Sequence, residues 1–106
     1  MVLYEVNLKI KKEVGQNFLN WLPGHMKRVL KADGFFQASL FQEDKNNTEK
    51  ESGFLNLTVF YKVKTISDLE NYFDGYAHEM REEGLSAFPG KFEASRRVHS
   101  LVEELN

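Results

Sequence analysis

Trp21 and His25 are four residues apart, so on one helix their side chains would share a face. A histidine beside an aromatic wall could bind a ligand or exchange a proton near neutral pH. The simpler interpretation is a core tryptophan next to a hydrogen-bonded or surface histidine, because no second metal ligand is suitably spaced nearby. The pair therefore indicates either a pocket wall or ordinary packing, and it does not indicate a metal site.

Arg96 lies on the same face of the last expected strand as three apolar residues: Phe92, Ala94 and Val98. A guanidinium buried on that face needs an anionic partner. One such partner is the carboxylate or phosphate of a ligand. The other is an acidic residue of the preceding helix: Glu70, Glu79 or Glu82. Both satisfy the same desolvation demand, so both remain open.

Three tyrosines, Tyr4, Tyr61 and Tyr76, fall on helix-facing positions, and their hydroxyls need partners if they are buried. We expect them to border the same space as Trp21 and Arg96, between sheet and helices. The candidate ligand-binding residues are Trp21, His25, Tyr61, Tyr76, Arg81 and Arg96. A small and possibly anionic ligand is the class that this set would bind.

His78 and Arg81 are three residues apart on the second expected helix, where a histidine could bind a ligand or haem iron. His78 follows Phe73 by five residues, which turns it about 140° away from the buried stripe. A solvated helix face is therefore the favoured interpretation of this pair, and the REEG segment at residues 81–84 is interpreted as surface in the same way.

Composition excludes several classes of protein. The chain has 106 residues, with 14 Lys and Arg against 16 Asp and Glu, and it has no cysteine. Disulfide frameworks, thiolate zinc sites, iron–sulfur clusters and cysteine nucleophiles are therefore excluded. The near-neutral charge argues against a nucleic-acid partner. Three histidines without ligand spacing argue against a metal, and no cofactor motif such as a phosphate-binding loop is present.

The first ten residues carry Glu5, Asn7 and Lys9 between apolar positions, which interrupts any signal-peptide core. No segment approaches the roughly 20 apolar residues of a membrane-spanning helix. We therefore expect a cytoplasmic protein without a membrane partner.

The hydrophobic periodicity predicts a strand at residues 2–10 and a helix at 13–32, in which Pro23-Gly24 should cause a kink or a division into two short helices. Strand-like alternation returns at 35–42, where Phe36, Ala38 and Leu40 share one phase. The polar segment 43–53 is interpreted as an exposed hairpin loop.

The second half of the chain has the same order of predicted elements. A strand is predicted at 54–63, a helix at 65–84 that Gly84 ends, a turn at 85–90 and a strand at 92–102 before a short acidic tail. The order β-α-β-β-α-β is typical of a ferredoxin-like α+β fold, in which a four-stranded antiparallel sheet has two helices on one face. Residues 1–106 are expected to form a single domain.

One face of this sheet would lack a helical cover. It is expected to carry apolar residues that could form a homodimer interface: Leu3, Phe41, Phe54, Phe60 and Leu101. Polar residues on the same face would complete that interface: Asn7, Asn56, Thr58, Arg97 and His99. A partly apolar uncovered face needs a partner, and a second copy of the chain is the simplest one.

Two stretches, residues 21–38 and 72–98, resemble a family of small uncharacterised bacterial proteins that is known only as a domain of unknown function. The resemblance rests on a Trp and a His in the first helix, a Gly-aromatic step, an Arg-Glu-Glu-Gly-Leu segment and a Phe-x-Ala-x-Arg strand. Those positions are Trp21, His25, Gly34, Phe35, Tyr72, Arg81, Glu82, Glu83, Gly84, Leu85, Phe88, Gly90, Phe92, Ala94 and Arg96. The resemblance implies ferredoxin-like subunits in a dimeric α+β barrel, and it implies no established activity.

Three functions remain open. The first is a dimer that binds a small ligand without catalysis. The second, by analogy of fold alone, is an enzyme of the dimeric-barrel type, either a cofactor-free monooxygenase or a haem-degrading enzyme. The haem-degrading type pairs an Asn, a Trp and a His, for which Asn7, Trp21 and His78 are available, although in unsuitable places. The third is a protein-interaction or regulatory module.

Overall fold

The computed structural model describes residues 1–44 and 53–106. Most of the loop expected at 43–53 lies outside these residues. The described elements are β1 (Val2–Lys11), the short 3-10 turn η1 (Lys12–Val14), α1 (Gly15–Val29), β2 (Phe35–Gln42), β3 (Phe54–Val63), α2 (Ile66–Asp74), α3 (Tyr76–Ala87) and β4 (Phe92–Ser100).

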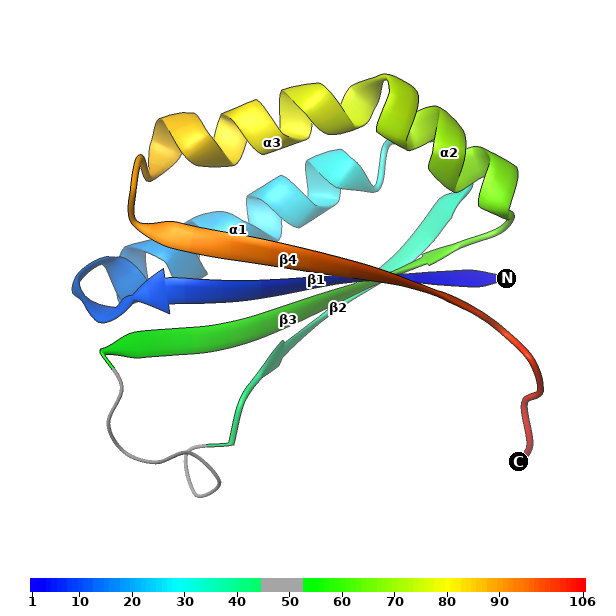
Figure 1. The fold of residues 1–106 in the computed structure, drawn as a ribbon, viewed down its shortest axis with the longest axis horizontal. Coiled ribbons are helices and arrows are strands. Elements are labelled where there is room, and N and C mark those ends of the chain that lie inside the picture. The colour runs from blue at the N-terminus through cyan, green and yellow to red at the C-terminus, as the bar shows by residue number, and fades with distance from the viewer. Residues whose placement is uncertain (45–52) are drawn as a thin grey trace.

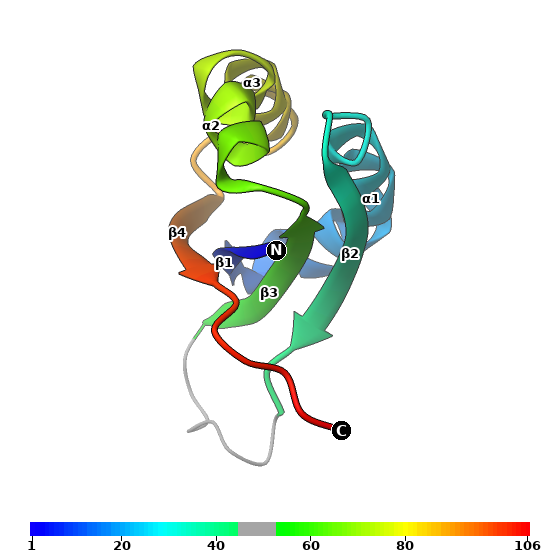
Figure 2. The ribbon, with the colours of Figure 1, turned by 90° about the vertical axis from the view of Figure 1, so that its right-hand side faces the viewer.

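The four strands form one antiparallel sheet in the order β2-β3-β1-β4. In the centre of the sheet, Val6 lies opposite Val59 of β3 on one side and opposite Arg96 of β4 on the other. The helices all lie on one face of the sheet, as Figures 1 and 2 show. The predicted ferredoxin-like α+β fold is confirmed.

The core lies between the sheet and the helices, because alternate strand residues turn their apolar side chains toward the helices. Ile10, Leu57 and Val63 are at most 1% exposed. Helix α1 contributes residues at three- and four-residue steps, which is the spacing of one helical face. The buried residues of α1 are Gly15, Phe18, Leu22, Met26 and Val29.

Helix α1 is one element that continues through Pro23, so the division into two short helices expected at Pro23-Gly24 is wrong. Proline removes one backbone donor from a helix interior, which destabilises it. Leu22 and Met26 on either side of the proline are buried in the core, and this packing holds the helix together.

The second helical segment differs from the prediction at two glycines. Gly75 adopts a non-helical conformation and separates α2 from α3, whereas Gly84 lies inside α3 and is buried. The break changes the helical phase: Tyr72 is buried, but Phe73 is 37% exposed, and the buried face resumes at Ala77. The predicted continuous stripe through Phe73 and the helix end at Gly84 are therefore wrong.

A bulge between Phe35 and Gln37 changes the face of β2. Phe35 is 7% exposed and packs in the core, whereas Phe36 is 50% exposed. Phe36 therefore does not share the helix-facing phase of Ala38 and Leu40, as its spacing had predicted, because the extra residue shifts the alternation. Strand β4 ends at Ser100 rather than at 102, and the residues after it extend away from the sheet (Figure 1).

Candidate functional site

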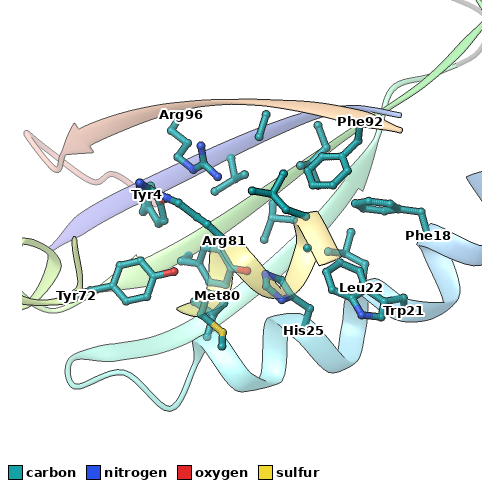
Figure 3. A pocket seen from close by; sticks show the side chains of 18 residues that line it. Tyr4, Phe18, Trp21, Leu22, His25, Tyr72, Met80, Arg81, Phe92 and Arg96 are labelled. Atoms are coloured by element: carbon teal, nitrogen blue, oxygen red, sulfur yellow. The ribbon is translucent and has the colours of Figure 1, made fainter. Parts of the chain in front are cut away.

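A cavity of about 280 Å³ lies between α1, α3 and the helix-facing side of the sheet. Its wall is mainly apolar and aromatic, and the residues labelled in Figure 3 outline it: Tyr4, Phe18, Trp21, Leu22, His25, Tyr72, Met80, Arg81, Phe92 and Arg96. This volume is just below the range typical of small-molecule pockets, roughly 300–1,000 Å³.

One end of the cavity is an aromatic cluster. The rings of Phe18 and Phe92 are 5.2 Å apart, and Trp21 packs edge-on against Phe18 at 5.4 Å. Gly84 of α3 makes this packing possible, since a methyl group on its Cα would be 3.3 Å from Phe92 and 3.6 Å from Trp21. This end of the cavity is therefore apolar.

His25 stacks on Trp21, with ring centroids 4.7 Å apart and an interplanar angle of 22°. Its Nδ1 lies 2.5 Å from Oε1 of Glu83, and the other carboxylate oxygen of Glu83 accepts a hydrogen bond from Nε of Arg28 at 2.7 Å. The stack and the carboxylate together fix the position of the imidazole, one turn of α1 after Trp21. Trp21 and His25 thus share a helix face, as their spacing predicts.

The protonation states of His25 and Glu83 follow from their surroundings. Burial lowers the pKa of His25 below its ordinary value of 6.5; Glu83 raises it, but by less, and Arg28 lowers it slightly. The hydrogen bond from Arg28 holds the pKa of Glu83 below its usual value, although burial opposes this, and His25 lowers it further. At neutral pH the site therefore contains a neutral imidazole beside a carboxylate.

Arg81 of α3 and Arg96 of β4 both line the cavity. In Figure 3 they lie near Tyr4, at the end opposite Phe18 and Phe92. Among the described residues, neither guanidinium forms an ion pair, and Arg81 only approaches the ring of Phe73, at 5.9 Å.

The expected burial of Arg96 is wrong. The residue is exposed, because β4 is an edge strand that the helices cover incompletely. Of the two partners left open for its guanidinium, the structure does not show the acidic one, since none of the described residues Glu70, Glu79 and Glu82 forms a salt bridge with it.

Three buried tyrosines surround the same cationic end. Tyr4, Tyr61 and Tyr72 are 2%, 3% and 6% exposed and line the cavity. Within the part of the chain that the structure describes, none of their hydroxyls has a hydrogen-bond partner. Burial raises the pKa of Tyr61 and of Tyr72, so these hydroxyls remain protonated and can donate. The cationic end thus contains several unused donors.

Tyr76 does not line the cavity. The break at Gly75 places it beside α1 instead, where its hydroxyl donates to the carbonyl oxygen of Arg28 at 3.0 Å. His78 is exposed on α3, and Asn7 lies on the other side of the sheet, hydrogen-bonded to Glu5 and Thr58. Asn7, Trp21 and His78 therefore do not form one site.

Sequence reasoning missed Glu83, which it placed on the solvated surface. Glu83 follows the buried Met80 by three residues, a spacing that puts both on one side of a helix, and this was the available signal. Tyr72 was not identified as a pocket residue because the break at Gly75 could not be located from the periodicity. Phe92 was interpreted only as one of the apolar residues on the face of its strand.

The face of the sheet opposite the helices, called the open face here, carries Leu3, Glu5, Phe54 and Phe60 on its central strands. Phe41 of β2 packs edge-on against Phe60 at 5.5 Å and is 56% exposed. Leu101, just beyond β4, is 48% exposed. Leu3, Phe41, Phe54 and Phe60 therefore lie on the face where the sequence placed them.

Glu5 is a buried charge on this open face, only 5% exposed. Hydrogen bonds from Asn7, His99 and Arg97 surround its carboxylate and lower its pKa to about 2. Tyr4 and Val6, the neighbours of Glu5 on β1, line the cavity, so alternation along the strand places this polar cluster on the opposite side of the sheet.

Among the described residues, no group of three or more His, Asp or Glu side chains could hold a metal ion. No helix in the ranges 1–44 and 53–106 is long and apolar enough to cross a membrane.

The fold and cavity define a small ferredoxin-like protein with an aromatic, arginine-bordered pocket. The profile described as "Domain of unknown function (DUF4286)" matches residues 1–102, and the chain belongs to this family. A comparison with curated proteins finds no match.

Solved structures of similar fold have low sequence identity. A protein from Deinococcus radiodurans, provisionally named an antibiotic biosynthesis monooxygenase, is 12% identical with a TM-score of 0.72, covering 100% of this chain and 97% of the other. A point mutant of MhuD, with two manganese protoporphyrin IX bound per active site, is 15% identical with a TM-score of 0.71, covering 100% and 99%. A dimeric ferredoxin-like protein from an uncultured marine organism is 12% identical with a TM-score of 0.70, covering 100% and 99%. These likenesses show the fold.

Proposed function

We propose that the protein binds a small amphipathic carboxylate in the cavity between α1, α3 and the sheet. The observation that carries this proposal is the cationic end of the cavity, where Arg81 and Arg96 have no acidic partner among the described residues. Guanidinium groups form bidentate hydrogen bonds with carboxylates, and the tyrosine hydroxyls beside them can donate further bonds.

The two ends of the cavity specify different parts of the ligand. An anionic group would lie near Tyr4 and Tyr72, where the positive charge and the unused hydroxyls are found. An apolar or aromatic body would extend toward Phe18 and Phe92, since burial of apolar area there is favourable. This division favours an aryl-alkyl acid over a highly charged phosphate ester.

Binding can be measured at Trp21, because it is the only tryptophan of the chain and lines the cavity. Titration with 3-phenylpropanoate is expected to shift the indole N–H resonance of Trp21, and 3-phenylpropanol, which lacks the charge, should bind at least about tenfold more weakly. Equal affinities for acid and alcohol, or no shift with either, would refute the proposal.

Variants test the role of the arginines. Arg81→Gln and Arg96→Gln should each weaken acid binding by about tenfold, the loss expected for a charge-assisted hydrogen bond. Arg97→Gln is the matched control, since Arg97 is the next residue of β4 and pairs with Glu5 on the open face. If Arg97→Gln weakens binding as much as Arg96→Gln, the carboxylate is not bound at the cavity.

The working unit in this proposal is a homodimer joined through the open face. Exposed apolar side chains support it: Phe41 on this face, and Val102 and Leu105 in the tail, which are 94% and 83% exposed. Phe41 and Phe60 are in contact on the open face, and contiguous exposed apolar side chains are typical of interaction surfaces. A similar fold is also found in a protein described as a dimeric ferredoxin-like protein.

An enzyme of the dimeric-barrel type is the second candidate. Two observations favour this candidate. The chain shares its fold with a provisionally named monooxygenase, and a histidine borders the aromatic cavity. Consumption of dissolved oxygen when a phenolic substrate is added would support this alternative. A protein-interaction role is the third candidate, and it applies if the open face binds a different protein.

A further inference from the structure

One ring nitrogen of His25 forms no hydrogen bond with the described residues. Nδ1 is bound to Glu83 at 2.5 Å, whereas Nε2 has no hydrogen-bond partner within residues 1–44 and 53–106. The side chain is 16% exposed and lines the cavity. An imidazole nitrogen without a partner beside a ligand-sized space is a candidate recognition group.

The partner of Nδ1 determines what Nε2 can do. An ionised carboxylate only accepts hydrogen bonds, so Nδ1 must carry the hydrogen that is shared with Glu83. In a neutral imidazole the other nitrogen then has a lone pair and accepts. Glu83 cannot turn away easily, because Arg28 binds its second oxygen at 2.7 Å.

The imidazole is also held at a fixed angle. Its ring stacks on Trp21, so the imidazole plane, which contains Nε2, is nearly parallel to the indole plane. Figure 3 places His25 between the arginine end of the cavity and the aromatic end. A group that Nε2 accepts from would therefore lie along the body of a bound ligand and not at its carboxylate.

We infer that His25 accepts a hydrogen bond from a hydroxyl group of the ligand, and that the ligand is a hydroxylated aryl-alkyl carboxylate. This inference rests on the proposed function, since it assumes that the carboxylate is bound by Arg81 and Arg96. A ligand without a hydroxyl would displace water from Nε2 and leave that acceptor unpaired, which weakens binding.

The test compares 3-phenylpropanoate with its 2-, 3- and 4-hydroxyphenyl analogues, followed at the indole resonance of Trp21. The best of the three phenols should bind about fivefold more tightly than the parent acid, which corresponds to one net hydrogen bond. Three positions of the hydroxyl on the ring are compared. The carboxylate is held at the arginine end of the cavity, and the hydroxyl must then reach Nε2 of His25.

Two variants link the preference to His25. His25→Phe retains a ring that can stack on Trp21 but removes both nitrogens, so it should bind parent and phenol equally. Glu83→Gln replaces an obligate acceptor with a side chain that can also donate to Nδ1, so the hydrogen can move to Nε2 and the preference should shrink. The ¹⁵N resonances of the His25 ring report this change directly in Glu83→Gln, and the dispersion of the backbone amide resonances shows whether each variant is folded.

The outcomes separate the two claims. If the parent acid binds and no phenol binds more tightly, the role of His25 is refuted while the proposed function stands. A preference that persists in His25→Phe also refutes that role, because the hydroxyl is then recognised elsewhere. Failure of every acid to bind refutes both.

Discussion

His25 shows most clearly how residues set the properties of the cavity. Burial favours its neutral form and the Glu83 carboxylate favours its charged form, and burial has the larger effect on its pKa. The stacked indole of Trp21 supplies much of the apolar cover on one side of the ring. The outcome is a neutral imidazole whose tautomer is fixed by its neighbour.

We therefore expect His25 to titrate below pH 6.5 in an NMR experiment on the folded protein. Glu83→Gln should lower the midpoint further, because it removes the negative charge that favours the imidazolium, while Arg28 remains nearby. Since the unfolded chain takes up this proton more readily, stability should fall as the pH drops below about 6.5. A midpoint above 6.5, or a rise in Glu83→Gln, would contradict this account.

The residues of the site were only partly predictable from sequence. Spacing alone brought Trp21 and His25 together, since four residues make one helical turn. It could not reveal that Glu83, 58 residues later in the chain than His25, reaches the same imidazole, because that contact depends on how α3 packs against α1. Arg96 was assigned to the correct face of its strand but not to its exposed position at the sheet edge.

At the scale of elements, the turns between helices and strands determine where the cavity walls lie. Gly34 follows α1 with a φ of +84°, and its carbonyl accepts from the backbone N–H of Lys64, the residue just after β3. A Cβ at this position would lie 2.2 Å from Oδ2 and 2.6 Å from Cβ of Asp68 in α2. The glycine therefore allows α2 to approach the start of β2.

Gly34→Ala should lower the free energy of unfolding by about 2 kcal/mol or more, from left-handed strain plus the contact with Asp68. Gly90→Ala is a matched control, because its φ is +70° but a Cβ there meets no atom within 4 Å. It should lose only the strain, about 1 kcal/mol. Urea unfolding of the two variants measures the difference, and equal losses would show that the Asp68 contact is unimportant.

Alternating polarity predicted the four strands and their order along the chain, because half-buried strands leave a clear period of two. The helical break at Gly75 and the bulge at Phe36 were not predictable in the same way. A glycine in a helical pattern can lie inside the helix, as Gly84 does, or interrupt it, as Gly75 does. Tertiary packing decides between these possibilities, and the phase of every later residue depends on that choice.

At the scale of the whole molecule, we propose that one face of the sheet binds the ligand and the other binds a second subunit. The helix-covered face contains the cavity, and the open face combines exposed Phe41 with the buried Glu5 cluster. A dimer through the open face would cover the apolar side chains and leave the cavity on the outer side of each subunit.

Native mass spectrometry of the purified protein should accordingly show twice the mass of one chain. Phe41→Glu should shift the protein to monomers, since a carboxylate would be buried at the interface without a partner. Ile66→Glu, at an exposed position of similar accessibility on α2, should leave the dimer intact. A wild-type monomer with the same fold would instead indicate that the open face binds a different protein.

The most direct test of the central claim locates 3-phenylpropanoate on the protein by intermolecular NOEs, using ¹³C-labelled ligand. The account predicts contacts from its ring protons to Trp21 and Phe92 and from the methylene next to its carboxylate to Arg81 or Arg96. Contacts confined to the open face, for example to Phe41 and Phe60, would contradict it, because the carboxylate would then be bound away from the cavity.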